Sequence, residues 1–348
     1  MKPETLSERR KLILGLVVQE FVERAKPVGS MYLVKHYGLD VSPATVRNEL
    51  AALAELGYLR QPHTSAGRVP TEKGYRFFVG ELMQRSELPS ATKHTINHQF
   101  YQARHEVDEW MKLAASVLAT QSQAASLVTP PQVSQIRFKH LELIHTSGRQ
   151  VLMVIVMENG HVVQQMLVLR DVQNQEQLSA AANEINVAFS GRPALAFEEA
   201  HPEFSLLAAD ILKLLQKEIT QADQHLLGEV FHDGWNNVLA EPEFSESNAA
   251  QRALRVLEER PLLEDLLSQT MGHSEIGGVQ VLIGGEGRWE ELNDFSMVLA
   301  RYGSADLASG YLGVVGPMRM SYGRAVTAVD YVAGLLSDMV VENLTESD

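Results

Sequence analysis

The chain has 348 residues, 45% of them hydrophobic, and at about 100–200 residues per domain this length predicts two or three domains with a sizeable core. The formal charge of -14, from 30 Lys and Arg against 44 Asp and Glu, argues, taken whole, against a protein that binds nucleic acid or coats an acidic membrane. The sequence contains no cysteine, which excludes disulfides, thiolate metal sites and a cysteine nucleophile and fits a reducing cytosol.

The amino terminus and the apolar runs of the chain predict the location of the protein in the cell. The amino terminus, MKPETLSERRKL, is charged where a signal peptide needs an apolar stretch, so no export is expected. The longest wholly apolar run, Val151–Met157, is far shorter than the ~20 residues that a membrane-spanning helix requires. We therefore expect a soluble, cytoplasmic protein with no membrane partner.

The charge is distributed unevenly along the chain. Residues 1–85 hold 13 Lys and Arg against 9 Asp and Glu, a net charge of +4, whereas the other 263 residues hold 17 against 35, a net charge of -18. A basic first quarter on an acidic body points to an amino-terminal module that binds nucleic acid.

Two helical patterns open this basic segment. The first begins after a possible N-cap, Ser7, and ends at Lys26-Pro27. Its expected buried stripe consists of Leu12, Ile13, Leu16, Val17 and Phe21. The second is short, with Ser30 as its possible cap and Gly38 as its end. Its expected inward side chains are Leu33, Val34 and Tyr37.

A third helix has the clearest boundaries. Ser42 supplies an N-cap hydroxyl, Pro43 suits the first helical position, and Gly57 suits the C-terminal end. The expected buried stripe is Val46, Leu50 and Leu53. The first turn and a half instead carries small and hydrogen-bonding residues mostly outside that stripe, namely Ala44, Thr45, Arg47 and Asn48.

Such an amino end is typical of a recognition helix, which enters the major groove of DNA with its first residues. Arg can bind guanine and Asn adenine through two hydrogen bonds each, so we expect Thr45, Arg47 and Asn48 to read bases. Ser42 and the first free N–H groups of the helix are expected to hold a phosphate.

Residues 58–70 then predict two short strands joined by a turn, the wing of a winged helix-turn-helix. Polar side chains suited to the DNA backbone lie on this hairpin at His63, Thr64, Ser65 and Arg68. A further helix follows, with Lys73 and Arg76 as candidate phosphate contacts. Its apolar residues Phe77, Phe78 and Leu82 are expected to pack against the wing. Modules of this pattern also serve as protein–protein adaptors, but the positive charge and the polar amino end of the third helix favour DNA.

Three strings resemble one family closely: KPVGSMYL, GLDVSPATVRNELAALAELGYL and QPHTSAGRVPTEKGYRFFV. They are similar to the amino-terminal domain of the HrcA family, the heat-inducible transcription repressors of bacteria. The resemblance resumes in VLMVIVMENGHV, LAEPEF, VQVLIGGEG and GYLGVVGPMRMSYGRAVTAVDYVAGLL. It implies a homodimeric repressor of chaperone operons that binds an inverted-repeat operator in double-stranded DNA and is kept active by a GroEL-type chaperonin. It also implies a GAF-like domain interrupted by an inserted dimerisation domain.

Read independently, the acidic body has an α+β pattern. A polar helical stretch is followed by three antiparallel strands over residues 136–170, with a hairpin at Asn159-Gly160, and then by mostly helical residues to about 270. Strands return at Val279–Ile283, Phe295–Tyr302 and Gly310–Val315, before a final helix over 323–344. The simplest explanation is one α+β domain with an insertion, although two consecutive domains are also allowed.

Pattern and resemblance together predict an α+β multidomain chain in five parts. These are a winged-helix DNA-binding domain (1–85), a connecting helix (86–123), the first part of a GAF-like domain (124–174), an inserted, mainly helical dimerisation domain (175–274) and the second part of the GAF-like domain (275–348).

Few residues in the body suggest chemistry. Gly284, Gly285 and Gly287 follow a strand but lack the spacing of a dinucleotide-binding loop, so a hairpin turn is favoured. His94 and His98 are one helical turn apart without an acidic third ligand nearby, and we expect no metal site. No catalytic constellation occurs, so neither an enzyme nor a cofactor is expected. The alternative function is a ligand-gated regulator whose GAF-like domain senses a small molecule.

Overall fold

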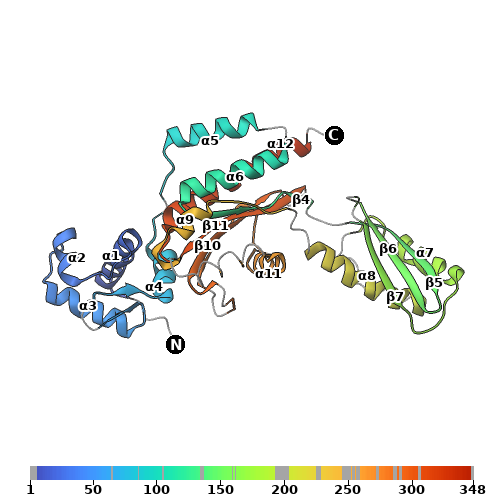
Figure 1. The fold of residues 1–348 in the computed structure, drawn as a ribbon, viewed down its shortest axis with the longest axis horizontal. Coiled ribbons are helices and arrows are strands. Elements are labelled where there is room, and N and C mark those ends of the chain that lie inside the picture. The colour runs from blue at the N-terminus through green and yellow to red at the C-terminus, as the bar shows by residue number, and fades with distance from the viewer. Residues whose placement is uncertain are drawn as a thin grey trace. The chain divides into compact units, whose positions relative to one another are not determined.

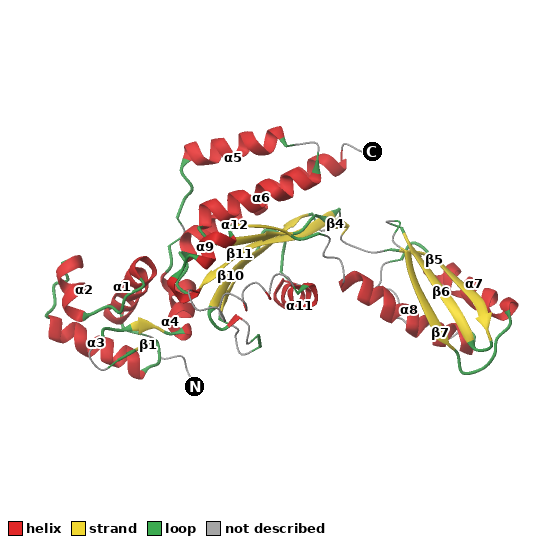
Figure 2. Ribbon diagram, in the orientation of Figure 1, coloured by secondary structure: helices red, strands yellow, loops and turns green. Residues whose placement is uncertain are grey.

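The computed structural model divides the chain into two compact units. The first unit comprises Met1–Pro130, Glu229–Gly303 and Gly310–Asp348, and the second comprises Pro131–Gly228 and Ser304–Ser309. Figure 1 shows the course of the chain, and Figure 2 distinguishes its helices from its strands. The structure describes residues 6–63, 66–84, 86–103, 106–133, 137–158, 160, 162–192, 204–224, 229–244, 252, 255, 259–271, 274–284, 288–289, 292–304 and 307–345.

The amino-terminal module of the first unit contains three helices, a hairpin and a further helical segment. These are α1 (Glu8–Arg24), α2 (Ser30–Tyr37), α3 (Pro43–Glu55), β1 (Leu59–Arg60), β2 (Val69–Pro70), α4 (Glu72–Phe77) and the π-helical turn η1 (Phe78–Leu82). Ser7 and Ser42 cap α1 and α3 through their hydroxyl groups, and Gly38 ends α2 at a φ of 60°, which glycine adopts without steric cost. The order of elements expected from the sequence is confirmed.

Helix α1 is buried over a wider face than its expected stripe. Ile13, Leu16 and Val17 are buried as expected, but Leu14 and Val18 are fully buried too, and Leu12 is 54% exposed. The expectation for Leu12 was therefore wrong. The physical reason is that α1 contacts α3 on one side and β2, α4 and η1 on others, so more than one stripe faces apolar neighbours.

The core of the first unit is a sheet covered by helices. Its strand order is β8 (Phe231–Asp233), β3 (Ala125–Val128), β11 (Ala308–Pro317), β10 (Phe295–Gly303) and β9 (Val279–Ile283). The short β4 (Gln132–Val133) pairs with Ala308 and Ser309 at the start of β11, and all four of these residues belong to the second unit. Helices α6 (Val107–Ser122) and α12 (Tyr322–Thr345) pack on each other and on this sheet, whereas α11 (Arg260–Met271) lies on the opposite side in Figure 1. The three carboxyl-terminal strands and the final helix expected from the sequence are confirmed.

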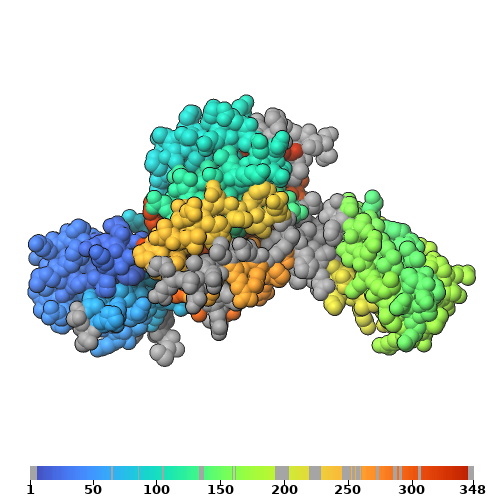
Figure 3. All heavy atoms as spheres, viewed as in Figure 1, coloured from blue at the N-terminus to red at the C-terminus, as the bar shows by residue number. Residues whose placement is uncertain are grey.

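Residues 86–123 form two helices where one connecting helix was expected. They are α5 (Ser90–Gln102) and α6, and Figure 3 shows α5 in cyan lying over α6 at the surface. The indole of Trp110 in α6 is buried and donates a hydrogen bond of 2.7 Å to the carbonyl of Ala103, just beyond the end of α5. Helix α6 is thus part of the core rather than a spacer.

The second unit is built on a sheet of its own. Strands β5 (Phe138–Ser147), β6 (Gln150–Met157) and β7 (Val162–Val168) pair antiparallel in that order, and helices α7 (Gln175–Phe189) and α8 (Leu206–Gln224) accompany them. One face of the sheet joins α7 and α8 in a hydrophobic cluster that includes Met153, Ile155, Leu178, Phe189 and Ile211. The three antiparallel strands are confirmed; Asn159 of the expected turn lies outside the described residues.

The grouping of these strands differs from the expected division. Residues 136–170 were assigned to the GAF-like domain and 175–274 to the insertion, but the compact second unit runs from 131 to 228 and contains both the strands and α7. Conversely, β8, α9 (Trp235–Leu239), η3 (Pro242–Phe244) and α11 lie in the first unit. The reason is that β5 and β7 pair only with β6 among the described strands, so the inner face of this sheet is closed by α7 and α8. Of the residues between 245 and 258, within the stretch expected to be mostly helical, the structure describes only Arg252 and Arg255.

No helix within the described ranges has both the length and the apolar character that crossing a membrane requires.

Candidate nucleic-acid interface

The amino end of α3 is closed by a serine cap. The Ser42 hydroxyl accepts a hydrogen bond from the backbone N–H of Thr45 at 3.1 Å and shares another with the Thr45 hydroxyl at 2.9 Å. Pro43 occupies the first turn, where its missing N–H costs nothing. The remaining N–H groups of this turn point out of the helix end and suit an anion.

The two faces of α3 differ in burial as the sequence predicted. Val46, Leu50 and Leu53 are buried against the rest of the module, and Arg47 and Asn48 are exposed. Within the described part of the chain, neither Arg47 nor Asn48 has a hydrogen-bond or ion-pair partner. In the view of Figure 3, no other described segment of the first unit covers the blue surface of α2 and α3. Two hydrogen-bonding side chains are thus presented outward from a rigid helix.

The β1–β2 hairpin follows directly and is tied to the start of α2. Leu59 pairs with Pro70 and Arg60 with Val69, and the backbones of Arg68 and Val28 exchange hydrogen bonds of 2.8 and 2.9 Å. His63 is exposed at the tip of the hairpin. Thr64 and Ser65 lie outside the described residues, so their expected role has no structural description.

The guanidinium of Arg68 is only partly engaged. Its Nε is buried and, among the described residues, has no hydrogen-bond partner. Its backbone is held on both sides by Val28, so the direction in which the side chain leaves the hairpin is defined. Among the described residues Arg68 has no ion-pair partner, and its contact with a phosphate stays a prediction.

Lys73 and Arg76 are placed differently from the sequence expectation of phosphate contacts. The Lys73 ammonium donates to the carbonyl of Leu56 at 2.8 Å and lies 4.3 Å from the centre of the Tyr58 ring. Leu56 is at the carboxyl end of α3, about 20 Å from Ser42 at a rise of ~1.5 Å per residue. The Arg76 guanidinium binds Glu72 at 2.6 Å and the carbonyl of Ile283 on β9 at 3.2 Å. Both cations therefore serve contacts within the protein.

Glu20 is a structural residue that the sequence pattern placed outside the buried stripe of α1. Its side chain is almost fully buried, and Tyr37 of α2 donates a hydrogen bond to it at 2.8 Å. Burial by itself would raise the pKa of this carboxyl, but hydrogen bonds from Tyr37 and Tyr32 and the positive charges nearby hold the pKa below its ordinary value. Glu20 thus ties α2 to α1 as a carboxylate.

The cap of α3 makes a direct prediction about local stability. Replacing Ser42 by alanine removes the acceptor for the Thr45 N–H, which should cost about 1 kcal/mol and speed amide exchange in the first turn of α3 about fivefold. Native-state hydrogen exchange measures this. The matched control is Ser7→Ala on α1, whose cap bond is longer at 3.4 Å and whose loss should have a smaller effect. Unchanged exchange at Thr45 in Ser42→Ala would contradict the cap.

Known proteins match this chain over nearly its whole length. A family model described as the HrcA protein C terminal domain matches residues 108–326. A heat-inducible transcription repressor HrcA of Roseiflexus castenholzii is 46% identical over 345 residues, covering 97% of this chain and 95% of the relative. Its counterpart in Herpetosiphon aurantiacus is 42% identical over 342 residues, covering 96% and 95%. That of Thermomicrobium roseum is 40% identical over 337 residues, covering 97% and 96%.

One solved structure shares the fold. A crystal structure described as that of a hypothetical protein superimposes with a TM-score of 0.59 at 21% sequence identity, covering 97% of this chain and 99% of that one. This likeness supports the mixed α and β multidomain fold alone. The sequence relatives carry the family assignment, since they match nearly end to end and are transcription repressors rather than enzymes. The chain therefore belongs to the HrcA family of heat-inducible transcription repressors.

Proposed function

We propose that residues 1–85 form a winged helix-turn-helix that binds an inverted-repeat operator in DNA, and that the chain represses heat-shock chaperone operons as a homodimer. The observation that carries this proposal is the amino end of α3, where Arg47 and Asn48 are exposed without partners in the described chain, beside the cap formed by Ser42. A helix with this end in the major groove brings both side chains to base edges.

Each candidate residue has a role set by its chemistry. Thr45, Arg47 and Asn48 read bases, the Arg through two donors aimed at guanine and the Asn through a donor and an acceptor matched to adenine. Ser42 and the first N–H groups of α3 hold one phosphate. His63, Thr64, Ser65 and Arg68 hold the backbone beside the wing. Lys73 and Arg76 are also kept as candidate phosphate contacts, because both are exposed, although each already makes a contact within the protein.

The charge distribution supports binding through this module alone. Residues 1–85 carry +4 and the remainder -18, so the acidic body repels phosphates while the module attracts them. Non-specific contact by any other surface is thereby disfavoured.

Two features support a homodimer, namely the two-fold symmetry of an inverted-repeat operator and an exposed apolar sheet face on the second unit. An inverted repeat is read by two recognition helices related by a two-fold axis. In the second unit, the face of the β5–β7 sheet turned away from α7 carries exposed apolar side chains, namely Ile144, Val162, Met166 and Val168. A patch of this kind is typical of a protein–protein interface, and we propose that this unit is the dimerisation domain. The core sheet with α6 and α12 would correspond to the GAF-like domain.

We also propose that a GroEL-type chaperonin regulates the DNA-binding activity of this repressor. Chaperonin that is free of unfolded clients would keep the repressor active, and heat would withdraw it. Purified chaperonin should then raise the fraction of this protein that binds its operator.

Selection of bound duplexes from a random pool at ~150 mM salt tests DNA binding, two-fold symmetry and half-site spacing together. We expect an inverted repeat with one preferred spacing. Absence of any sequence preference would contradict DNA recognition and favour an adaptor, and a selected motif without two-fold symmetry would contradict the dimer.

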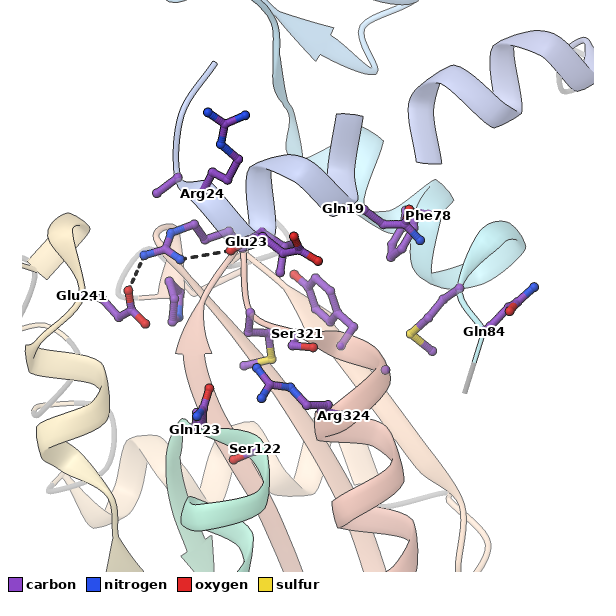
Figure 4. A pocket seen from close by; sticks show the side chains of 18 of the residues that line it. Gln19, Glu23, Arg24, Phe78, Gln84, Ser122, Gln123, Glu241, Ser321 and Arg324 are labelled. Carbon is purple, nitrogen blue, oxygen red and sulfur yellow. Dashed lines mark hydrogen bonds and ion pairs between the residues drawn. The ribbon is translucent and has the colours of Figure 1, made fainter. Parts of the chain in front are cut away.

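A ligand-gated regulator is the second candidate function. The observation in its favour is a cavity of about 1060 Å³ in the first unit, lined by the carboxyl end of α1, η1 and the start of α12 (Figure 4). Operator binding that responds to a metabolite extract and not to added chaperonin would favour this candidate over the first.

A further inference from the structure

An arginine of the core, Arg319, reaches the amino-terminal module. Arg319 lies in the turn between β11 and α12, and this turn is held at both ends. The Tyr322 hydroxyl donates to the carbonyl of Met318 at 2.6 Å and is hydrogen-bonded to Ser296 at 2.8 Å. The backbone N–H of Met320 donates to Pro317 at 2.8 Å. The base of the Arg319 side chain is thus fixed to the core.

Two carboxylates of the core orient the Arg319 guanidinium. Nη2 binds both Glu241 and Glu243, the latter at 3.1 Å, and Nε also binds Glu243. Glu241 directly precedes η3 and Glu243 lies within it, and η3 is anchored by the stacking of Phe244 on Phe295 with ring centres 4.6 Å apart. Burial lowers the pKa of Arg319, but the two carboxylates more than offset this and raise it, so the side chain remains charged.

The third nitrogen of this guanidinium, Nη1, contacts α1. Nη1 lies 3.4 Å from the carbonyl of Val22, in the last turn of the helix, where the unpaired carbonyl groups carry partial negative charge. Figure 4 shows Glu241 from the core and Glu23 and Arg24 of α1 at the edge of the cavity that Arg319 also lines. The Arg319 side chain is only 11% exposed, so solvent competes little for its hydrogen bonds.

Arg319 is one of several discrete contacts between the amino-terminal module and the core. Arg319 lines two cavities, one of about 1060 Å³ and one of about 470 Å³, and each is bordered by α1 on one side and by the core on the other. Other contacts between the two parts include Arg76 on the carbonyl of Ile283 and the buried rings of Tyr75 and Tyr322, whose centres are 6.0 Å apart. Beside these two cavities, the hydrogen bond from Arg319 to the carbonyl of Val22 is therefore one of the contacts on which the angle between the module and the core depends.

We propose that Arg319 is a positioning residue that fixes the angle of the DNA-binding module on the core and thereby sets the half-site spacing that the dimer accepts. This inference rests on the function proposed above. One added base pair rotates a half-site by about 35° and moves it by about 3.4 Å. A dimer whose modules are rigidly attached to the core therefore binds half-sites at one spacing, whereas a dimer with loosely attached modules binds them at several spacings.

The first experiment measures operator affinity against spacer length in the full-length protein. The parent protein should lose affinity about tenfold when one base pair is added to or removed from the preferred spacer. In Arg319→Met the loss of affinity caused by adding or removing one base pair should be about threefold or less. The affinity of this variant at the preferred spacer should also be lower than that of the parent protein. Arg319→Lys keeps a positive charge near Glu241 and Glu243 but lacks the fork that reaches Val22, so it should flatten the dependence as well.

Arg324→Met is the matched control. Arg324 lines the larger cavity five residues further along, is exposed, and within the described residues has no ion-pair partner. Its replacement should leave the spacer dependence unchanged. An Arg319 variant that keeps the parental spacer preference would overturn the proposal. So would one that loses affinity equally at every spacing, or one that binds the operator more tightly.

A second measurement needs no DNA and separates this inference from the proposed function. The chain has no cysteine, so spin labels attach only at introduced sites, Lys35→Cys on α2 and Ser116→Cys on α6, which are both exposed positions. The distance distribution between the labels should be narrow in the parent background and clearly broader with Arg319→Met or Arg319→Lys. Equal widths would overturn the positioning role even if DNA binding is established. Broadening in a protein that selects no DNA would instead contradict only the proposed function.

Discussion

Replacing Arg47 by alanine should relax sequence preference at one base pair in each half-site, at a cost of about 1–3 kcal/mol per half-site. Arg47 is exposed on the amino end of α3 and, in the described chain, makes no competing ion pair, so the loss reports the contact with DNA. Because each base-reading arginine contributes two donors to guanine, the variant should distinguish guanine from other bases poorly at that one position. Competition binding with every single-base variant of the selected operator measures this.

Arg68→Ala is the contrasting variant. Arg68 lies on the hairpin at a partly exposed position and has no ion-pair partner among the described residues, and we expect its terminal nitrogens to bind a phosphate. Its replacement should weaken binding to all sequences by a similar factor and reduce the dependence of affinity on salt by about one unit of slope, with sequence preference unchanged. A uniform loss in Arg47→Ala, or a change of preferred base in Arg68→Ala, would contradict the assigned roles.

Replacing Gly74 by alanine should disrupt the amino-terminal module, with a loss of about 3 kcal/mol or more. A Cβ at Gly74 would lie 2.2 Å from the carbonyl oxygen of Tyr58. That carbonyl cannot move away freely, because it accepts hydrogen bonds from both the backbone N–H and the hydroxyl of Thr71, each at 3.0 Å. Accommodating the methyl group therefore breaks the junction between the hairpin and α4.

Gly80→Ala serves as its control, since Gly80 lies six residues further on at an exposed position and a Cβ there meets nothing within 4 Å. Hydrogen exchange of α1–α3 should be much faster in Gly74→Ala and nearly unchanged in Gly80→Ala, while exchange in the β5–β7 sheet is parental in both. Operator affinity should fall only in Gly74→Ala. Parental exchange throughout the module in that variant would refute the steric argument.

Helix α3 illustrates which features can be predicted from sequence. Its cap at Ser42, its buried residues Val46, Leu50 and Leu53 and its exposed Arg47 and Asn48 all agree with the structure. These properties depend on interactions within one or two helical turns, so the residues that determine them are neighbours in the chain. The candidate base-reading residues could be named for the same reason, although their contacts with DNA remain a prediction.

Lys73 and Arg76 illustrate the opposite case. Both are exposed cations beside the hairpin, and the sequence pattern is compatible with phosphate contacts. The partners that occupy them, the carbonyls of Leu56 and Ile283, lie 17 and 207 residues away in the chain. No periodicity or cap signal contains information about such pairs.

The amino-acid sequence by itself determined the charge division between module and body, the boundaries of α3, the strands β5–β7 and β9–β11 and the family resemblance, but not β3 and β8 of the core sheet. Each of these follows from composition or from residues close together in the chain. Only the tertiary structure decided that strands β5–β7 belong with α7 and α8, that Arg76 binds β9, and that Arg319 joins the core to α1. The physical reason is that the partner of a strand edge or of a charged side chain is chosen by packing between distant segments, which local propensity does not encode.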